Sequence, residues 1–120
     1  MRLQDILSIT HAHPLTAGPD LERQVRLGFA SDLMSDVLRY DVAQGLLVTG
    51  LANPQVVRTA EMADISAILL VRGKTPPPET MELARQVGIP IMGTDMIMFE
   101  TCGRLFAAGL PACSRHNGHS

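Results

Sequence analysis

Runs of apolar residues separated by amphipathic stretches predict alternating strands and helices after residue 45. Residues 45–50 (GLLVTG) and 66–73 (SAILLVRG) are largely apolar, as is typical of strands buried on both faces of a parallel sheet. A third, shorter strand is predicted over 89–93. The resulting β-α-β-α-β-α order favours parallel strands with helices on both faces. The helices of this pattern are predicted over 53–64, 77–88 and 98–110.

Local signals mark the ends of these helices. Asn53 is a candidate N-cap, and Pro54 suits the first helical position, where a missing N–H costs nothing. Gly88 is a typical helix stop. The last predicted helix carries an apolar stripe along one face. That stripe consists of Phe99, Cys102, Gly103, Phe106 and Leu110.

The first third of the chain is less regular. A short helix is predicted over 2–8, and weak alternation over 23–30 predicts a half-buried strand. A helix from about residue 32 to residue 40 follows. We expect this part of the chain to add one or two strands of mixed direction to the sheet.

Composition fits a single globular domain over residues 1–110, followed by a polar, mobile tail over 111–120. The net charge of −2 and the 3% aromatic content argue against nucleic-acid binding. No apolar run is long enough to span a bilayer. Two cysteines form no disulfide framework, so we expect a cytoplasmic protein. We expect neither a cofactor nor a metal.

Residues 72–76, RGKTP, contain the Gly-Lys-Thr triplet that closes many nucleotide-binding P-loops. A P-loop needs another glycine five positions earlier, where Ile68 stands. Residues 76–78 are all proline, which removes N–H groups from the start of the next helix. The sequence therefore excludes an ordinary P-loop kinase or ATPase.

Anion binding at this end of the sheet remains possible without a P-loop. In open α/β sheets, ligands bind beyond the carboxyl ends of parallel strands, where helix N-termini offer free N–H groups. Arg72 and Lys74 add donors for phosphate or carboxylate. The alternative is that these residues only make turns and caps, as in every βα loop. The candidate ligand-binding residues are Thr49, Gly50, Asn53, Arg72, Gly73, Lys74, Thr75 and Thr94.

Two Ser-Asp pairs lie in residues 28–38, GFASDLMSDVL. If this segment is helical, Asp32 and Asp36 share one face. A helix start capped by Ser31, with Asp32 answering the helix dipole, is the simpler interpretation. The other is a carboxylate pair that faces a ligand or a partner subunit; catalysis would need a pocket that separates the two pKa values. The candidate interface residues are Ser31, Asp32, Met34, Ser35 and Asp36.

The remaining metal-ligating and nucleophilic side chains have simpler interpretations. The HAH of residues 11–13 lacks a visible third ligand for a metal. Cys113, His116 and His119 form a C-x2-H-x2-H run on the predicted tail, where we expect no function. Cys102 lies on the apolar stripe without an adjacent base and is expected to be a packed thiol.

The chain resembles the DRTGG-domain family over about residues 1–110. The resemblance rests on GFASDLMSDVL at 28–38, the segments 53–70 and 68–95, and FETCGRLFAAGL at 99–110. It implies a three-layer α/β/α fold with a mixed, mainly parallel sheet, similar to the N-terminal domain of HPr kinase/phosphorylase. The string that names the family is absent. Val71-Arg72-Gly73 stands where many members have Thr-Gly-Gly.

The resemblance also implies a regulatory or dimer-forming module rather than an enzyme. Our leading hypothesis is a non-catalytic regulatory module that acts as a homodimer, with interface area from Leu33, Met34 and Met98. The alternative is a sensor that binds a nucleotide or another anion at the carboxyl ends of the strands. An enzyme of kinase or phosphatase type ranks last, because no complete catalytic constellation is visible.

Overall fold

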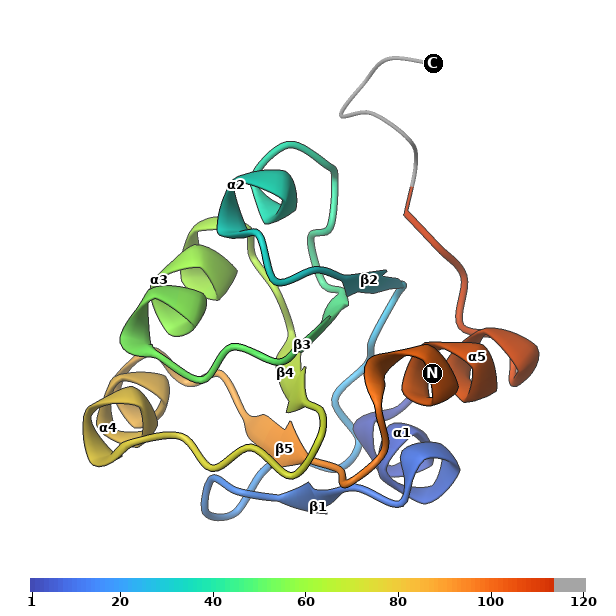
Figure 1. Cartoon of the computed structure of the whole chain (residues 1–120), viewed down its shortest axis with the longest axis horizontal. Coiled ribbons are helices and arrows are strands. Elements are labelled where there is room, and N and C mark those ends of the chain that lie inside the picture. Colours follow the sequence, from blue (N-terminus) through green and yellow to red (C-terminus); the bar gives the residue numbers. More distant parts are fainter. Residues whose placement is uncertain (114–120) are drawn as a thin grey trace.

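A computed structural model describes residues 1–113, which are built around a five-stranded sheet (Figure 1). The strand order is β1-β5-β4-β3-β2. Strands β2 to β5 are parallel, and β1 pairs antiparallel with β5. The predicted mixed, mainly parallel sheet is confirmed. The strands are β1 (His13–Pro14), β2 (Gly28–Ala30), β3 (Leu46–Thr49), β4 (Ala67–Leu70) and β5 (Ile91–Gly93).

Five helices cover the sheet in two layers. Helices α2, α3 and α4 lie on one face, and α1 and α5 lie on the other (Figure 1). This is the three-layer α/β/α arrangement that was predicted. None of the helices within residues 1–113 is long and apolar enough to cross a membrane. The helices are α1 (Leu3–Thr10), α2 (Met34–Val37), α3 (Pro54–Met62), α4 (Pro78–Val87) and α5 (Met98–Ala107).

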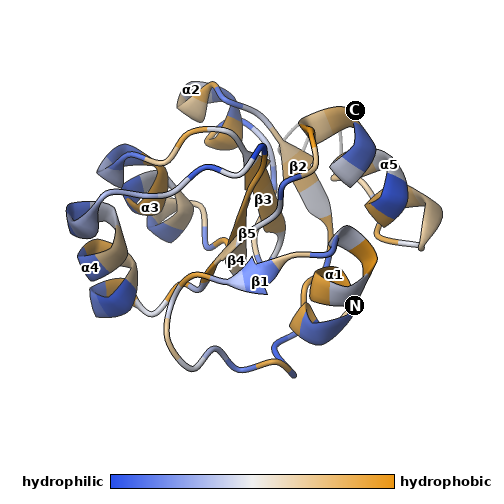
Figure 2. Cartoon of the chain, turned by 60° about the horizontal axis from the view of Figure 1, so that its bottom comes forward, coloured by the Kyte–Doolittle hydropathy of each residue, from blue (hydrophilic) through white to orange (hydrophobic). Residues whose placement is uncertain are grey.

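The sheet separates two apolar cores. Along β4 the side chains alternate: Ile68 and Leu70 face the core under α2, α3 and α4, whereas Leu69 packs with α1 and α5. All four β4 residues are buried, which explains the nearly continuous apolar run in the sequence. Figure 2 shows β3 to β5 as hydrophobic strands between the helical layers, while β1 is hydrophilic.

The predicted helix ends are confirmed for α3 and α4. The Asn53 side-chain oxygen accepts a hydrogen bond from the Val56 N–H at 3.3 Å, and Pro54 occupies the first helical position. Gly88 ends α4 with φ +76°, and its N–H donates to the Ala84 carbonyl at 2.9 Å. A residue with a side chain is strained in that left-handed conformation.

Two predictions in the first third need correction. The strand predicted over 23–30 is limited to Gly28–Ala30, because residues 23–25 bond to the chain around the start of α1 and Arg26 bonds to the loop before β3. The helix predicted from residue 32 to residue 40 has only four residues, Met34–Val37, and its N-cap is Leu33. Ser31 therefore does not cap it.

The apolar stripe predicted for α5 does not pack as a unit. Thr101 and Leu105 fill the sheet-facing side of α5 and are buried, whereas Phe99 is 87% exposed and Phe106 is 69% exposed. The Thr101 hydroxyl donates to the Ile97 carbonyl at 2.9 Å, which satisfies this polar group inside the core. The polar residue Thr101 thus lies on the buried face of α5, whereas the aromatic rings of Phe99 and Phe106 face solvent.

The chain remains packed beyond the predicted boundary at residue 110. The Gly28 N–H donates to the Pro111 carbonyl at 2.9 Å, and Gly28 forms a parallel bridge with Ala112. Residues 114–120, including His116 and His119 of the C-x2-H-x2-H run, lie outside the described residues.

Candidate functional site at the carboxyl edge of the sheet

The carboxyl ends of β2 and β3 are joined by the Asp32 carboxylate. Asp32 Oδ1 accepts a hydrogen bond from Thr49 Oγ1 at 2.9 Å and another from the Gly50 N–H at 2.7 Å. Asp32 precedes α2, whereas Asp36 lies within it and pairs with Arg39 at 3.7 Å. The two aspartates therefore do not form the helical pair that their spacing predicted.

A local turn places Asp32 at this edge. Ser31 Oγ accepts a hydrogen bond from the Leu33 N–H at 2.9 Å, and the Ser31 N–H donates to the Val48 carbonyl at 3.1 Å. Short serine turns of this kind compete with helix formation. They hold the chain outside the helix for two residues, which points the Asp32 side chain back toward β3.

The environment of Asp32 favours its ionised form. The Gly50 N–H is the main cause that lowers the pKa of the Asp32 carboxyl, with further lowering by the Thr49 hydroxyl and by the positive charges of Arg72 and Lys74. Partial burial acts in the opposite direction. The site therefore contains a fixed negative charge beside two cations.

The loop after β4 has an unusual backbone. Arg72 and Gly73 are both left-handed, with φ of +60° and +65°. Arginine is disfavoured there by roughly 1–2 kcal/mol, so the loop holds Arg72 in a conformation suited to glycine. Bonds from the Arg72 N–H to the Met96 carbonyl and from the Gly73 N–H to the Thr94 carbonyl, both 2.9 Å, fix this loop against the loop after β5.

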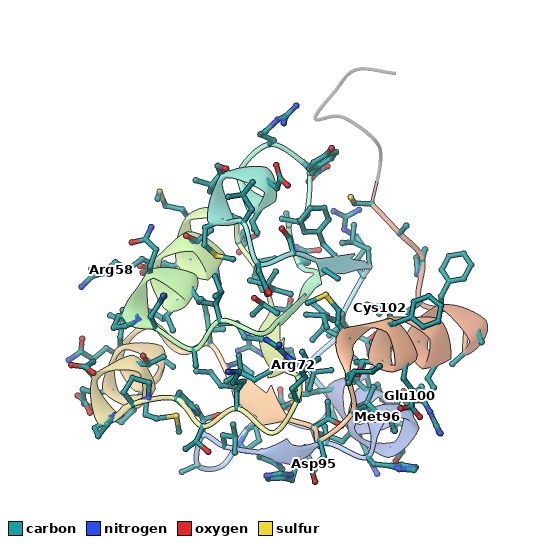
Figure 3. All side chains as sticks on the ribbon, viewed as in Figure 1. Arg58, Arg72, Asp95, Met96, Glu100 and Cys102 are labelled. Carbon is teal, nitrogen blue, oxygen red and sulfur yellow. The ribbon has the colours of Figure 1, made fainter. Side chains whose placement is uncertain are left out.

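The Arg72 side chain lies against the carboxyl end of β3. A Cβ atom at Gly50 would lie 2.3 Å from Arg72 Nη2, so any side chain there would displace the guanidinium. In Figure 3 Arg72 lies between the two helical layers, whereas Arg58 points outward from α3. The Asp95 side chain lies near Gly73, since a Cβ atom at Gly73 would lie 3.1 Å from Asp95 Oδ1.

The cations of this edge are free of ion pairs. Within residues 1–113, neither Arg72 nor Lys74 has a carboxylate within 4.0 Å, and both side chains are exposed. An exposed cation without a partner can bind an incoming anion without first breaking an internal pair. Arg72 and Lys74 differ in this respect from Arg2, Arg26, Arg39, Arg85 and Arg104, each of which has a carboxylate partner.

Three predicted ligand-binding residues lie outside the cluster around Asp32, and two of them make structural contacts. Asn53 caps α3 through its side-chain oxygen. Thr94 is buried; its hydroxyl donates to the Thr10 carbonyl at 2.7 Å and accepts from the Met96 N–H at 3.2 Å. Thr75 is exposed in the loop before α4. The edge thus brings together Asp32, Thr49, Gly50, Arg72, Gly73 and Lys74, with Asp95 beside them.

The candidate interface residues differ in their surroundings. Met34 is partly buried against the core under α2 and α3, while Ser35 is exposed. Asp32 belongs to the edge site, although its spacing from Asp36 fits helical periodicity and therefore predicts a helix. The signal for its true position is Ser31-Asp32 directly after a strand, where a serine turn is common.

A separate cavity of about 690 Å³ lies near the amino ends of β4 and β5, between residues 15–23 and α4. Its cations have partners: Arg85 pairs with Glu82, and Arg23 donates to the Ser66 carbonyl at 3.0 Å. The lining is mainly apolar. This cavity offers volume but little free charge, so the carboxyl edge is the better candidate for an anion.

Among residues 1–113, no group of three or more His, Cys, Asp or Glu side chains is placed to hold a metal ion. Burial raises the pKa of the Cys102 thiol, which keeps it protonated and weakens it as a nucleophile.

The fold and this edge are those of a three-layer open α/β protein. The chain belongs to the DRTGG-domain family, whose sequence model matches residues 5–108. No curated protein matches the chain in sequence.

The chain is similar in fold to a solved structure. That structure is the crystal structure of the CBS and DRTGG domains of the regulatory region of Clostridium perfringens pyrophosphatase, complexed with the activator diadenosine tetraphosphate. The TM-score is 0.72 at 20% sequence identity, and the match covers 92% of this chain and 47% of that one. The chain therefore spans about half the length of that regulatory region.

Proposed function

We propose that this chain is a non-catalytic regulatory module that binds an anionic small molecule, of which a nucleotide is the best-matched class, at the carboxyl edge of the sheet. The observation that carries the proposal is the pair of exposed cations, Arg72 and Lys74, that have no ion-pair partner within residues 1–113 and lie beside the fixed carboxylate of Asp32.

The edge offers complementary groups for a nucleotide. The Arg72 guanidinium is a planar fork that can donate two hydrogen bonds to one phosphate, and Lys74 adds a second positive charge. Asp32 uses Oδ1 for Thr49 and Gly50, which leaves Oδ2 as an acceptor for sugar hydroxyls. A simple inorganic anion would use only the cations.

Two further observations support a regulatory role. The C. perfringens structure of similar fold is a regulatory region in complex with a nucleotide activator. Within the described residues, no nucleophile has both an adjacent base and an oxyanion-binding group. The proline run before α4 also removes the backbone donors on which a P-loop depends.

The test is ligand binding by the purified full chain, measured by thermal shift and calorimetry. The probes are ATP, AMP, diadenosine tetraphosphate and inorganic phosphate. Arg72→Gly removes the guanidinium and suits the left-handed backbone, so it preserves the fold. Loss of a charge-assisted contact worth about 1.5–3 kcal/mol predicts roughly ten- to hundred-fold weaker nucleotide binding.

Arg58→Ala is the matched control, because Arg58 is also exposed but points outward from α3 (Figure 3). We expect it to bind the nucleotide like the natural chain. A panel in which no probe raises the melting temperature would contradict the proposal. So would an Arg72→Gly variant that binds with unchanged affinity.

Self-association is the second function that we propose, and it is favoured by the exposed aromatic residues of α5. Large exposed apolar groups on one helix face are typical of protein–protein contact sites. Light scattering at micromolar concentration tests it, with a dimer expected and a monomer contradicting it.

A further inference from the structure

The outer side of α5 carries apolar residues that the folded monomer does not need. We call Phe99, Cys102, Gly103 and Phe106 the α5 stripe. Phe99 is 87% exposed and Phe106 is 69% exposed, and they are two of the three phenylalanines in the chain. Thr101 and Leu105 already cover the sheet from the opposite side of the helix. The α5 stripe is therefore a second apolar face.

The spacing of this stripe is symmetric along the chain. The four positions are spaced symmetrically about the midpoint between Cys102 and Gly103, and a phenylalanine stands at each end, Phe99 and Phe106. Two antiparallel copies of α5, related by a two-fold axis through that midpoint, place Phe99 of each copy opposite Phe106 of the other. Two-fold interfaces require this reciprocity, since residue i must contact j while j contacts i.

The centre of the stripe permits close approach. A Cβ atom at Gly103 would have no other atom within 4 Å, so the surface there is open and lacks a side chain. Next to the stripe, between α5 and β2, lies an apolar groove of about 370 Å³ whose lining includes Phe29, Ala30, Phe106 and Leu110. The groove provides space into which aromatic rings of a second copy can pack.

Charge complementarity favours the same arrangement. Glu100 and Arg104 flank the stripe on one side and form an ion pair at 3.3 Å within the helix. With a rise of about 1.5 Å per residue, the two-fold axis brings Glu100 of one copy within one residue's rise of Arg104 of the other.

We propose that a second copy of this chain covers the α5 stripe, through antiparallel packing of α5 against α5 about a two-fold axis between Cys102 and Gly103. The proposal rests on the self-association proposed above and specifies its surface. The interface consists of two Phe99–Phe106 contacts, a close approach at Gly103 and two reciprocal Glu100–Arg104 pairs between the copies.

Sedimentation equilibrium of the full chain and its variants tests the surface. Phe106→Glu buries an unpaired carboxylate in each half of the interface, and we expect the dimer to dissociate about 100-fold more readily. Gly103→Ile fills the space at the axis and is expected to weaken the dimer as well. Met62→Glu is the matched control, because Met62 on α3 is 68% exposed and lies in the other helical layer.

A mixing experiment separates contacts between copies from contacts within one helix. Glu100→Arg and Arg104→Glu each break the pair inside α5 and each place like charges across the axis. We expect either variant alone to self-associate more weakly than the natural chain. Mixed in equal amounts, they regain association as a heterodimer, because opposite charges face each other only between the two different copies.

The outcomes distinguish this proposal from self-association in general. A natural chain that sediments as a monomer overturns both. A dimer that is unaffected by Phe106→Glu and Gly103→Ile uses another surface, which overturns the α5 interface alone. Absence of rescue in the mixture overturns the antiparallel arrangement, and circular dichroism shows that each variant is folded.

Discussion

Helices α4 and α5 are each ten residues long and follow consecutive parallel strands, yet their outer faces differ. The outer face of α4 carries the charged and amide side chains of Glu79, Glu82, Arg85 and Gln86, as expected of a solvated helix. The outer face of α5 carries Phe99 and Phe106. Folding requires only one apolar face per helix, and the second apolar face of α5 is the reason why we propose that α5 contacts a second copy of the chain.

The largest effect should come from the inner side of α5. Leu105 is 3% exposed and packs in the core with α1 and the sheet. Leu105→Ala removes buried apolar volume and leaves a cavity, which we expect to lower the unfolding free energy by about 2–5 kcal/mol. Urea denaturation at low protein concentration measures this change.

Phe106→Ala is the control for Leu105→Ala in the same helix. Although it removes a larger side chain, Phe106 is mostly exposed, so the unfolding free energy of the dilute protein should change by less than about 0.5 kcal/mol. A loss as large as that of Leu105→Ala would show that Phe106 belongs to the monomer core, and the contrast between the two helical faces would disappear.

The next effect is a dependence of stability on concentration. A dimer is stabilised by mass action, so the melting temperature of the natural chain should rise by about 2–4 °C for each tenfold increase in concentration. Phe99→Glu should remove this dependence, whereas Glu79→Gln on the outer face of α4 should keep it. Calorimetry measures the melting temperature of each protein over a hundred-fold concentration range. A melting temperature that is constant for the natural chain contradicts self-association.

Much of the fold could be predicted because its signals are local. The buried runs of β3 and β4, the Asn53-Pro54 start of α3 and the Gly88 end of α4 each follow from a few adjacent residues. The outward turn of Phe99 could not be predicted in this way. Apolar residues at helical spacing predict an apolar helix face. Which of two such faces packs on the sheet depends on the rotation of the helix about its own axis.

The candidate site shows a similar division. The carboxyl edge and its two cations follow from strand order, since parallel strands end at the same side of a sheet. The position of Asp32 does not, because the short Ser31 turn and the long-range bonds to Thr49 and Gly50 override helical spacing. The position of a polar residue at a strand end thus depends on long-range contacts, which the local sequence pattern does not predict.

A smaller effect is expected from Asp32, which extends the comparison from apolar faces to a polar contact. Asp32→Asn keeps an oxygen for Thr49 and Gly50 but loses the charge, and we expect a loss of about 0.5–1 kcal/mol in unfolding free energy at neutral pH. Because the folded-state pKa is lowered, this contribution is fully present above the ordinary aspartate pKa of 3.8 and is lost as pH falls through the folded-state pKa.

Urea denaturation of both proteins at neutral pH and below pH 3.8 measures this dependence. The difference between the natural chain and Asp32→Asn should shrink in acid. A difference that is constant across this range would mean that the Asp32 charge does not stabilise the edge, and that its hydrogen bonds act as neutral contacts.

The smallest effect should come from the outer face of α4. Glu82 pairs with Arg85 and Gln86 on the exposed side of the helix, and hydrogen bonding to Arg85 is the main cause that lowers the pKa of Glu82. Solvent screens such a pair, so Glu82→Gln should leave the unfolding free energy within experimental error. Any small contribution is present above pH 4.5 and is lost as the pH falls through the lowered pKa.

Sedimentation of Glu82→Gln should show unchanged association. If Glu82→Gln weakened the dimer as strongly as Phe99→Glu, charge on any outer helix face would control association, and the apolar character of α5 would no longer explain it.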